Sequence, residues 1–302
     1  MDRKKVSIRD LDIDVYSFNT VIVGSGCAGF NAADSLYSLG QKDIAIVTEG
    51  INMGTSRNTG SDKQTYYKLT TAGDTPDSVM DMAKTLFNGG CMHGDTALIE
   101  AAFSSRCFYK LVELGVPFPH NQYGEFVGYK TDHDPRQRAT SAGPLTSKFM
   151  TEGLERQVKD KGIAIFDGFL VIGILVHNND TAPYSDIEPI ELYKDAVPYK
   201  NETPYKDETP YNNTAASYNP AEINKKEIRT EKEAVGLVAI NLNDMQSASM
   251  GLTLFNCRNI IYATGGPAGM YLTSVYPESQ TGSLGIAFEA GARGVNLTES
   301  QY

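Results

Sequence analysis

The segment from residue 20 to residue 49 restricts most strongly what this chain can fold into. It begins with a short apolar run, Val21-Ile22-Val23, which is typical of a buried parallel strand. A G-x-G-x-x-G pattern follows at once, then apolar residues at helical spacing, then a second apolar run at residues 44–47. This order of strand, glycine turn, helix and strand predicts a βαβ unit that binds a dinucleotide.

Each glycine of the pattern has its own physical role. Gly24 permits the tight turn, Gly26 lets the backbone approach a pyrophosphate, and Gly29 lets the helix lie close to the sheet. Glu49 stands about twenty positions after Gly29, where a carboxylate can bind ribose hydroxyls. The alternative is that the glycines serve only the turn. The pattern does not separate NAD from FAD.

Composition excludes several classes of protein. The chain has 302 residues, enough for one large or two ordinary domains, and its net charge of −10 argues against a nucleic-acid partner. No apolar run approaches the ~20 residues of a membrane span, and the N-terminus lacks the apolar core of a secretory signal. Four scattered cysteines predict reduced thiols, with no disulfide frame and no metal site. We therefore expect a cytoplasmic protein.

The segments around the predicted βαβ unit alternate between loops, helices and strands. Residues 1–18 are expected to be a polar lead-in with an edge strand at 11–16, and residues 50–69 a loop that either wraps a cofactor or lies on the surface. Periodicity and capping residues predict the following further elements: helices at 74–88 (capped by Thr75), 95–114 and 144–160, and strands at 126–129 and 163–176.

The loop at residues 131–143 gathers four charged or titratable side chains: His133, Asp134, Arg136 and Arg138. Such a mixture can bind a carboxylate substrate or shuttle a proton. The interpretation that we favour is a solvated loop with internal ion pairs. His133 and Arg136 are the only local candidates for a catalytic role, and no catalytic residue is assigned.

Residues 177–233 differ in character, because Pro, Tyr and polar residues dominate and a Pro-Tyr pair recurs every six residues. We interpret this segment as a disordered insertion between strands. A hexapeptide solenoid and a partner-binding segment are the alternatives. Order is predicted to resume with strands at 234–240, 252–255 and 259–262, a helix at 281–290 and a strand at 293–297.

Several motifs together resemble the flavoprotein subunits of fumarate reductase and succinate dehydrogenase, and L-aspartate oxidase. They are VIVGSGCAG with Glu49, GTSRNTGSDKQ, ELGVPF, ATSAGPLTSKFMTEGL, IIYATGG and TGSLGIAFEAGA, in the order of the family. The first motif is shared by many NAD and FAD proteins. The later pair, ATGG and TG-x-x-G, is more specific and favours FAD.

The resemblance implies a role for each matching position. Val171 is expected to touch the adenine through its backbone, and Glu49 the ribose. The other residues implied to line the FAD site are Gly24, Ser25, Gly26, Ala28, Gly29, Thr55, Ser56, Gly60, Ser61, Ala263, Thr264, Gly265 and Ser283.

The chain departs from the family in three ways. Residues 52–60 contain no His for covalent attachment, so FAD is expected to be held non-covalently. Ser283 stands where the family has an Asp. No segment matches the later parts of the family that grip the substrate, so we expect the N-terminal part of a longer enzyme.

The implied fold is α/β: a Rossmann-like three-layer FAD-binding domain with a parallel sheet and a small antiparallel β element, without the capping domain. Its two parts would be residues 19–176 and 234–302. The implied function is hydride transfer between FAD and a small carboxylate-bearing substrate, with an unidentified electron-transfer partner. The alternatives are oxidation of an amino acid, as in L-aspartate oxidase, and a truncated, non-catalytic FAD-binding fragment.

Overall fold

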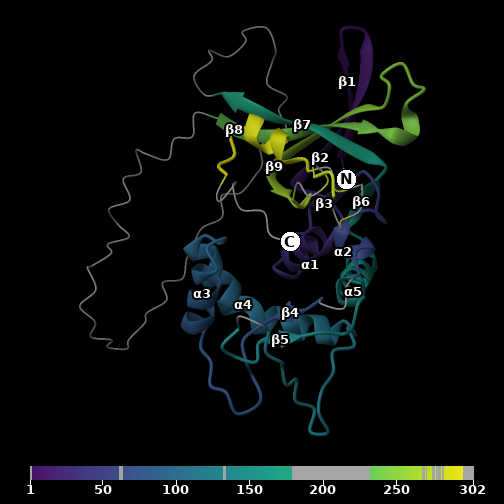
Figure 1. The fold of residues 1–302 in the computed structure, drawn as a ribbon. Helices are drawn as coiled ribbons and strands as arrows, with labels where there is room; N and C mark the ends of the chain where they lie inside the picture. The colour runs from purple at the N-terminus through teal and green to yellow at the C-terminus, as the bar shows by residue number, and fades with distance from the viewer. Residues whose placement is uncertain are drawn as a thin grey trace, which may run out of the picture. The chain divides into compact units, whose positions relative to one another are not determined.

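A computed structural model describes residues 2–60, 64–131, 134–178, 232–266, 269, 271–273, 276, 280 and 282–294 (Figure 1). The expected insertion at 177–233 lies almost wholly outside these residues, and so does most of the expected strand at 293–297. Within the described part, no helix is long and apolar enough to cross a membrane. Nor do His, Cys, Asp and Glu side chains there gather in a group of three that could hold a metal ion.

A seven-stranded, mostly parallel sheet forms the centre of the fold. Its middle strand, β2 (Leu11–Val23), is parallel to β3 on one side and to β9 on the other. The order across the sheet is β6 (Ala164–Asp167), β3 (Ile44–Thr48), β2, β9 (Leu252–Tyr262), β8 (Lys232–Asn241) and β7 (Phe169–Asn178), with β1 (Asp2–Ile8) antiparallel to the first half of β2.

The strand arrangement corrects two expectations. Residues 1–18 are not a lead-in, because β1 and β2 form a hairpin and β2 continues to Val23 without a break. The expected strands at 252–255 and 259–262 are one strand, β9, which pairs with β2 from Asp14–Thr253 to Val23–Tyr262. Polar residues at 256–259 hid this continuity, because pairing with a long neighbour keeps a strand extended even where its own residues are polar.

Helices cover one face of the sheet. Helix α1 (Cys27–Ser38) packs against α5 (Thr146–Asp160) and against β3, and the apolar residues between them are buried. Alternation along the strands directs Ile22 and Ile46 to this helical face. They form a core there with Phe30, Leu154 and Val158, among others.

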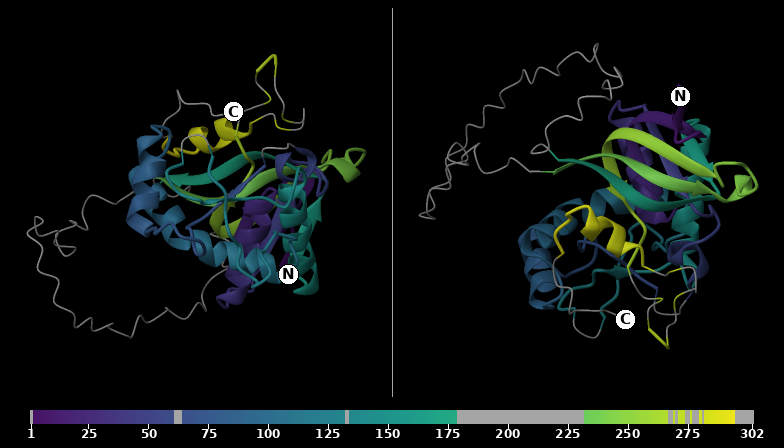
Figure 2. Two further views of the ribbon diagram at one scale, coloured as in Figure 1. Left: turned by 60° about the horizontal axis from the view of Figure 1, so that its bottom comes forward. Right: turned by 90° about the horizontal axis from the view of Figure 1, so that it is seen from above.

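Strands β8 and β7 continue the sheet beyond β9, and their buried side chains pack against the face of β2 and β3 opposite the helices (Figure 2). Val21 and Val47 point to this side and pack with Val171 of β7 and Leu237 of β8. Phe166 stands at the centre of an aromatic group, with its ring centroid 4.9 Å from that of Phe255. Because β7 is folded over β2 and β3, its first residues reach the edge where the parallel strands end.

A smaller group of elements surrounds the helix pair α3 (Val79–Asn88) and α4 (Gly94–Glu113), together with the short antiparallel strands β4 (Tyr66–Tyr67) and β5 (Ala139–Thr140). The expected helix at 74–88 begins only at Val79, where Ser78 accepts a hydrogen bond from the amide of Asp81. The expected strand at 126–129 is a single bridge between Tyr129 and Ala139.

Candidate functional site

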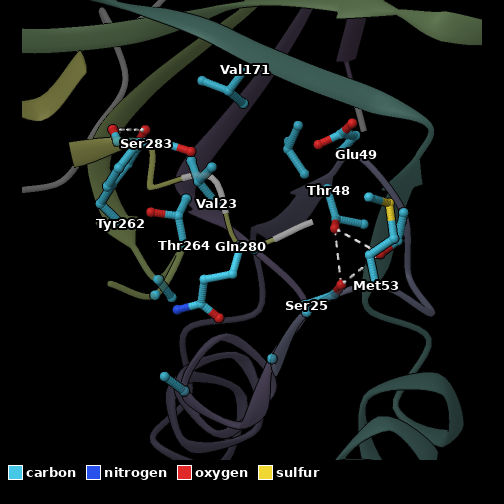
Figure 3. Close-up of a pocket in the computed structure, with 18 of the residues that line it drawn as sticks. Val23, Ser25, Thr48, Glu49, Met53, Val171, Tyr262, Thr264, Gln280 and Ser283 are labelled. Atoms are coloured by element: carbon cyan, nitrogen blue, oxygen red, sulfur yellow. Dashed lines mark hydrogen bonds between the residues drawn. The ribbon is translucent and has the colours of Figure 1, made fainter. Parts of the chain in front are cut away.

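A cavity of about 510 Å³ lies at the carboxyl ends of β2, β3 and β9 (Figure 3). Ligands of open α/β sheets bind in this position, because the loops after parallel strands meet there. The turn after β2 forms the floor, the residues after β3 and the start of β7 form one end, and the residues after β9 form the opposite wall.

The glycine turn is packed too tightly for side chains. Gly24 has a φ of +108°, and a Cβ there would lie 2.5 Å from the carbonyl oxygen of Ala263. A Cβ on Gly29 would lie 2.0 Å from the carbonyl oxygen of Gly24, so only glycine lets α1 approach the turn this closely. The assignment of these glycines to a turn and to close helix packing is therefore confirmed by geometry.

Helix α1 begins at the floor of the cavity. Its N-cap is Gly26, no side chain caps it, and its first turn carries no acidic residue. The positive end of the helix dipole and the amides of the first turn other than that of Cys27 are therefore available to an anion. Ser56 accepts a hydrogen bond from the amide of Cys27 (3.3 Å) and so joins the loop after β3 to the start of this helix.

Glu49 lies at the end of the cavity near β3, and it is the only acidic residue among the described residues that line the cavity. The hydroxyls of Ser25 and Thr48 lie 2.9 Å apart and fix the glycine turn against the end of β3. Asp167, at the end of β6, accepts a hydrogen bond from the amide of Ile51 (2.8 Å) and holds the loop that follows Glu49.

The helical segment α2 (Thr55–Asn58) brings two hydroxyl residues to the cavity. Arg57 anchors it by ion pairs with Glu155 and, at 3.7 Å, Glu152 of α5. Burial disfavours the charged form of Glu155, but hydrogen bonds from Lys159 and Arg57 outweigh it and hold the pKa of that carboxyl below its ordinary value.

Two hydroxyls on opposite sides of the cavity are buried without a hydrogen-bond partner. They are Oγ1 of Thr55 at the start of α2 and Oγ1 of Thr264 after β9. Both oxygen atoms have almost no accessible surface, so they lie beneath the wall and do not themselves face the cavity.

Most residues that the sequence assigned to a cofactor site lie together around this cavity. Gly29 stands behind the floor, Gly60 packs against Pro144 and Leu145 instead, and Ser61 lies outside the described residues. The assigned residues that line the cavity are Gly24, Ser25, Gly26, Ala28, Glu49, Thr55, Ser56, Val171, Ala263, Thr264, Gly265 and Ser283.

Sequence reasoning missed several lining residues, among them Met53, Phe169, Tyr262 and Gln280. Each lies within three residues of a residue that was assigned. Tyr262 had a detectable signal, because it is the last residue of the strand that leads into the Ala-Thr-Gly-Gly turn. The others reach the cavity only through tertiary packing.

The arginines of the charged loop after residue 131 pair mainly with aspartates at the start of α3 and just before it. The guanidinium of Arg138 is fully buried, lies 2.6 Å from Asp77 and donates to Tyr67 and Thr85. Arg136 pairs with Asp81 of α3 at 3.4 Å. Neither arginine lines the cavity, and His133 lies outside the described residues. The interpretation as a solvated loop with internal ion pairs is therefore wrong in part: Arg138 is buried, and the only ion pair inside the loop among the described residues is that of Arg138 with Asp134, at 3.5 Å.

No protein-family model matches the sequence, and no curated protein matches it. Solved structures do match in fold. Quinol fumarate reductase of E. coli is 17% identical with a TM-score of 0.63, over 91% of this chain and 37% of that one. The Sdh1 complex of Mycobacterium smegmatis with UQ1 is 14% identical with a TM-score of 0.65, over 91% and 38%.

The chain has the fold of fumarate reductase and succinate dehydrogenase flavoproteins. It spans about two fifths of the length of these chains. A 3-ketosteroid-delta4-(5alpha)-dehydrogenase of Rhodococcus jostii RHA1 shares the fold as well, at 15% identity and a TM-score of 0.57 over 92% of this chain and 55% of that one. The resemblance inferred from the motifs is thus confirmed at the level of the fold.

Proposed function

We propose that the cavity binds FAD non-covalently and that the chain is the cofactor-binding part of a flavoprotein oxidoreductase. Glu49 would accept hydrogen bonds from the adenosine ribose, and the amides at the start of α1 would bind the pyrophosphate. Thr55, Ser56 and the residues after β9 would hold the remainder of the cofactor.

The observation that carries this proposal is a cavity floored by a glycine turn and by the uncapped start of α1, with Glu49 at one end and the residues after β9 at the opposite wall. A ligand that spans this cavity needs a ribose at the Glu49 end, an anionic group beside the start of α1 and a further group at the opposite wall. FAD has this form, because a ribityl chain and a pyrophosphate join its two ring systems.

The residues that surround the cavity support non-covalent attachment. Residues 52–60 contain no His, and the described lining residues include neither His nor Cys. When bound, FAD would supply the capacity to accept or donate a hydride. The chain's own residues would position the cofactor and provide its electrostatic surroundings.

For the reaction we propose hydride transfer to or from a small carboxylate-bearing substrate, as in a fumarate reductase or a succinate dehydrogenase. The fold and the order of motifs support this class. Amino-acid oxidation is the alternative, and the steroid dehydrogenase shows that the same part of the fold occurs in an enzyme named for a different substrate. No residue described in this part of the chain identifies the electron-transfer partner.

An absorption spectrum of the purified protein, before and after acid precipitation, tests the proposal. We expect the visible absorption spectrum of a flavin, with the yellow colour in the supernatant after acid. Colour retained in the pellet would contradict non-covalent binding. A folded protein that neither carries nor takes up FAD, but binds NAD, would overturn the cofactor assignment.

A further inference from the structure

Tyr262 connects two segments of the cavity wall that the strands themselves do not join. It is the last residue of β9, its side chain lines the cavity, and its hydroxyl donates a hydrogen bond to the carbonyl oxygen of Ser283 (2.9 Å) (Figure 3). Ser283 immediately precedes α6 (Leu284–Glu289), and Gly282 and Ser283 themselves line the cavity.

This tether lies at one end of the cavity. Figure 3 shows Tyr262 and Ser283 on one side, beside Thr264 and Gln280, and Glu49 with Met53 on the other. If Glu49 binds the adenosine ribose, the ligand must extend past the start of α1 toward Tyr262. The residues at the Tyr262 end then face the flavin half of FAD.

We propose that Tyr262 is a positioning residue that holds the segment before α6 against the flavin half of the cofactor. This inference rests on the proposed FAD site. In the described part of the chain, two side-chain hydrogen bonds hold this wall: the one from Tyr262, and one from the amide of Gln280 to the carbonyl oxygen of Gly266 (3.0 Å). Without the first, the segment at 282–283 is free to move away from the ligand.

The environment of Tyr262 suits this task. The side chain is half-buried, and burial raises the pKa of its phenol, so the hydroxyl remains a hydrogen-bond donor at neutral and mildly alkaline pH. A phenylalanine would fill the same space on the wall but could not donate. The inference therefore concerns one hydrogen bond, and the substitution Tyr262→Phe removes it.

Two ligands separate a positioning role from a general structural one. ADP contains only the adenosine half of FAD, so its affinity reports on the Glu49 end. We expect Tyr262→Phe to raise the Kd of FAD and its rate of dissociation by about three- to tenfold, the loss of one neutral hydrogen bond. The Kd of ADP should stay unchanged, and the Tm of the FAD-free protein should fall by no more than about 2 °C, the loss of one hydrogen bond. Flavin fluorescence measures the first ligand, and competition or calorimetry measures the second.

Glu49→Gln and Tyr123→Phe are the matched controls. The first should weaken both ligands, because it acts at the end that they share. The second removes a hydroxyl from a side chain that is 80% exposed and should weaken neither. Equal weakening of FAD and ADP by Tyr262→Phe would overturn the positioning role in favour of a structural one. Unchanged FAD binding would overturn it as well. Failure of the wild-type chain to bind FAD would refute the proposed function instead.

Discussion

At the scale of single residues, close packing of main-chain atoms explains why particular positions of the cavity floor are glycine. The contact of Gly29 with the carbonyl oxygen of Gly24 is the tightest around the floor. A methyl group there has no flexible neighbour to displace, because the opposing atom belongs to the backbone.

We expect Gly29→Ala to lower the free energy of unfolding by about 1–3 kcal/mol and to abolish FAD binding, because α1 must move away from the turn. Urea unfolding and flavin titration measure the two effects. Gly285→Ala, in α6, is the matched control, since a Cβ there meets nothing within 4 Å. It should be neutral or slightly stabilising. Normal FAD binding by Gly29→Ala would contradict the role of this contact.

A second residue-scale feature is the carboxylate of Asp34 on α1, which is 5% exposed and lies 2.6 Å from Lys110 of α4. Lys161, just after α5, also binds it. Burial disfavours the charged carboxylate, but hydrogen bonds from the two lysines outweigh burial and lower its pKa. The group thus joins three helices through one charge.

We expect Asp34→Asn to cost about 1–2 kcal/mol at neutral pH, a value discounted because both lysines are partly exposed. The folded-state pKa lies below the unfolded value of about 3.9, so this stability is present above pH ~4 and is lost as the pH falls through the folded-state pKa. Unfolding curves from pH 7 down to 3 should therefore converge for wild type and variant. A constant difference would show that the charge of Asp34 is not responsible.

At the scale of elements, the cavity depends on short segments that are held by side chains from longer ones. Helix α2 has a single turn and could not persist alone. Its position depends on Arg57, whose side chain is 12% exposed and paired with Glu155 of α5. Thr55 and Ser56 line the cavity because α5 fixes this turn.

We expect Arg57→Met to weaken FAD binding about tenfold, because Thr55 and Ser56 lose their fixed positions, and to lower stability as Glu155 loses a partner. A double-mutant cycle with Glu155→Gln measures the coupling. Lys148→Met is the control, since its ion pair with Glu152 is 3.9 Å long and exposed. Additive effects of Arg57→Met and Glu155→Gln on FAD affinity would contradict the anchoring role.

Elements differ in how well the sequence predicts them. The unit from β2 to β3 was predicted because its signals are local: the glycine spacing, the helical periodicity and the acid at the strand end. The start of α3 was misplaced because Asp77, read as part of a helix, is instead bound to Arg138, sixty-one residues later. Strand β9 was divided because its continuity depends on β2. Tyr262 was missed as a site residue because only tertiary structure brings it to Ser283.

At the scale of the whole molecule, the charge of the chain and the charge of the cavity have the same sign. The net charge is −10, and Glu49 is the only charged side chain among the described residues that line the cavity. In the proposed function, backbone amides and the dipole of α1 would hold an anionic dinucleotide against a repulsive field.

We expect the Kd of FAD to stay constant or to fall by up to about threefold as NaCl rises from about 20 to about 300 mM. Over this range the Debye length shortens from about 20 to about 6 Å. Added salt screens the repulsion between FAD and the acidic chain. If lysine or arginine side chains bound FAD, added salt would instead weaken the binding. Flavin fluorescence titrations at several salt concentrations measure this. A tenfold rise in Kd would indicate a cationic contact from outside the described residues.

The pairing of β2 with β9 joins residues about 240 positions apart, from Asp14–Thr253 to Val23–Tyr262. During synthesis, one edge of β2 is therefore exposed until most of the chain has left the ribosome. A long apolar strand with an open edge is prone to pair with other chains, and pairing this distant in sequence forms slowly. The pairing of β9 with β2 then has two effects: it completes the cavity wall, and it covers the open edge of β2 that is prone to aggregation. We accordingly expect the cofactor to bind late in folding, only after β9 has paired with β2.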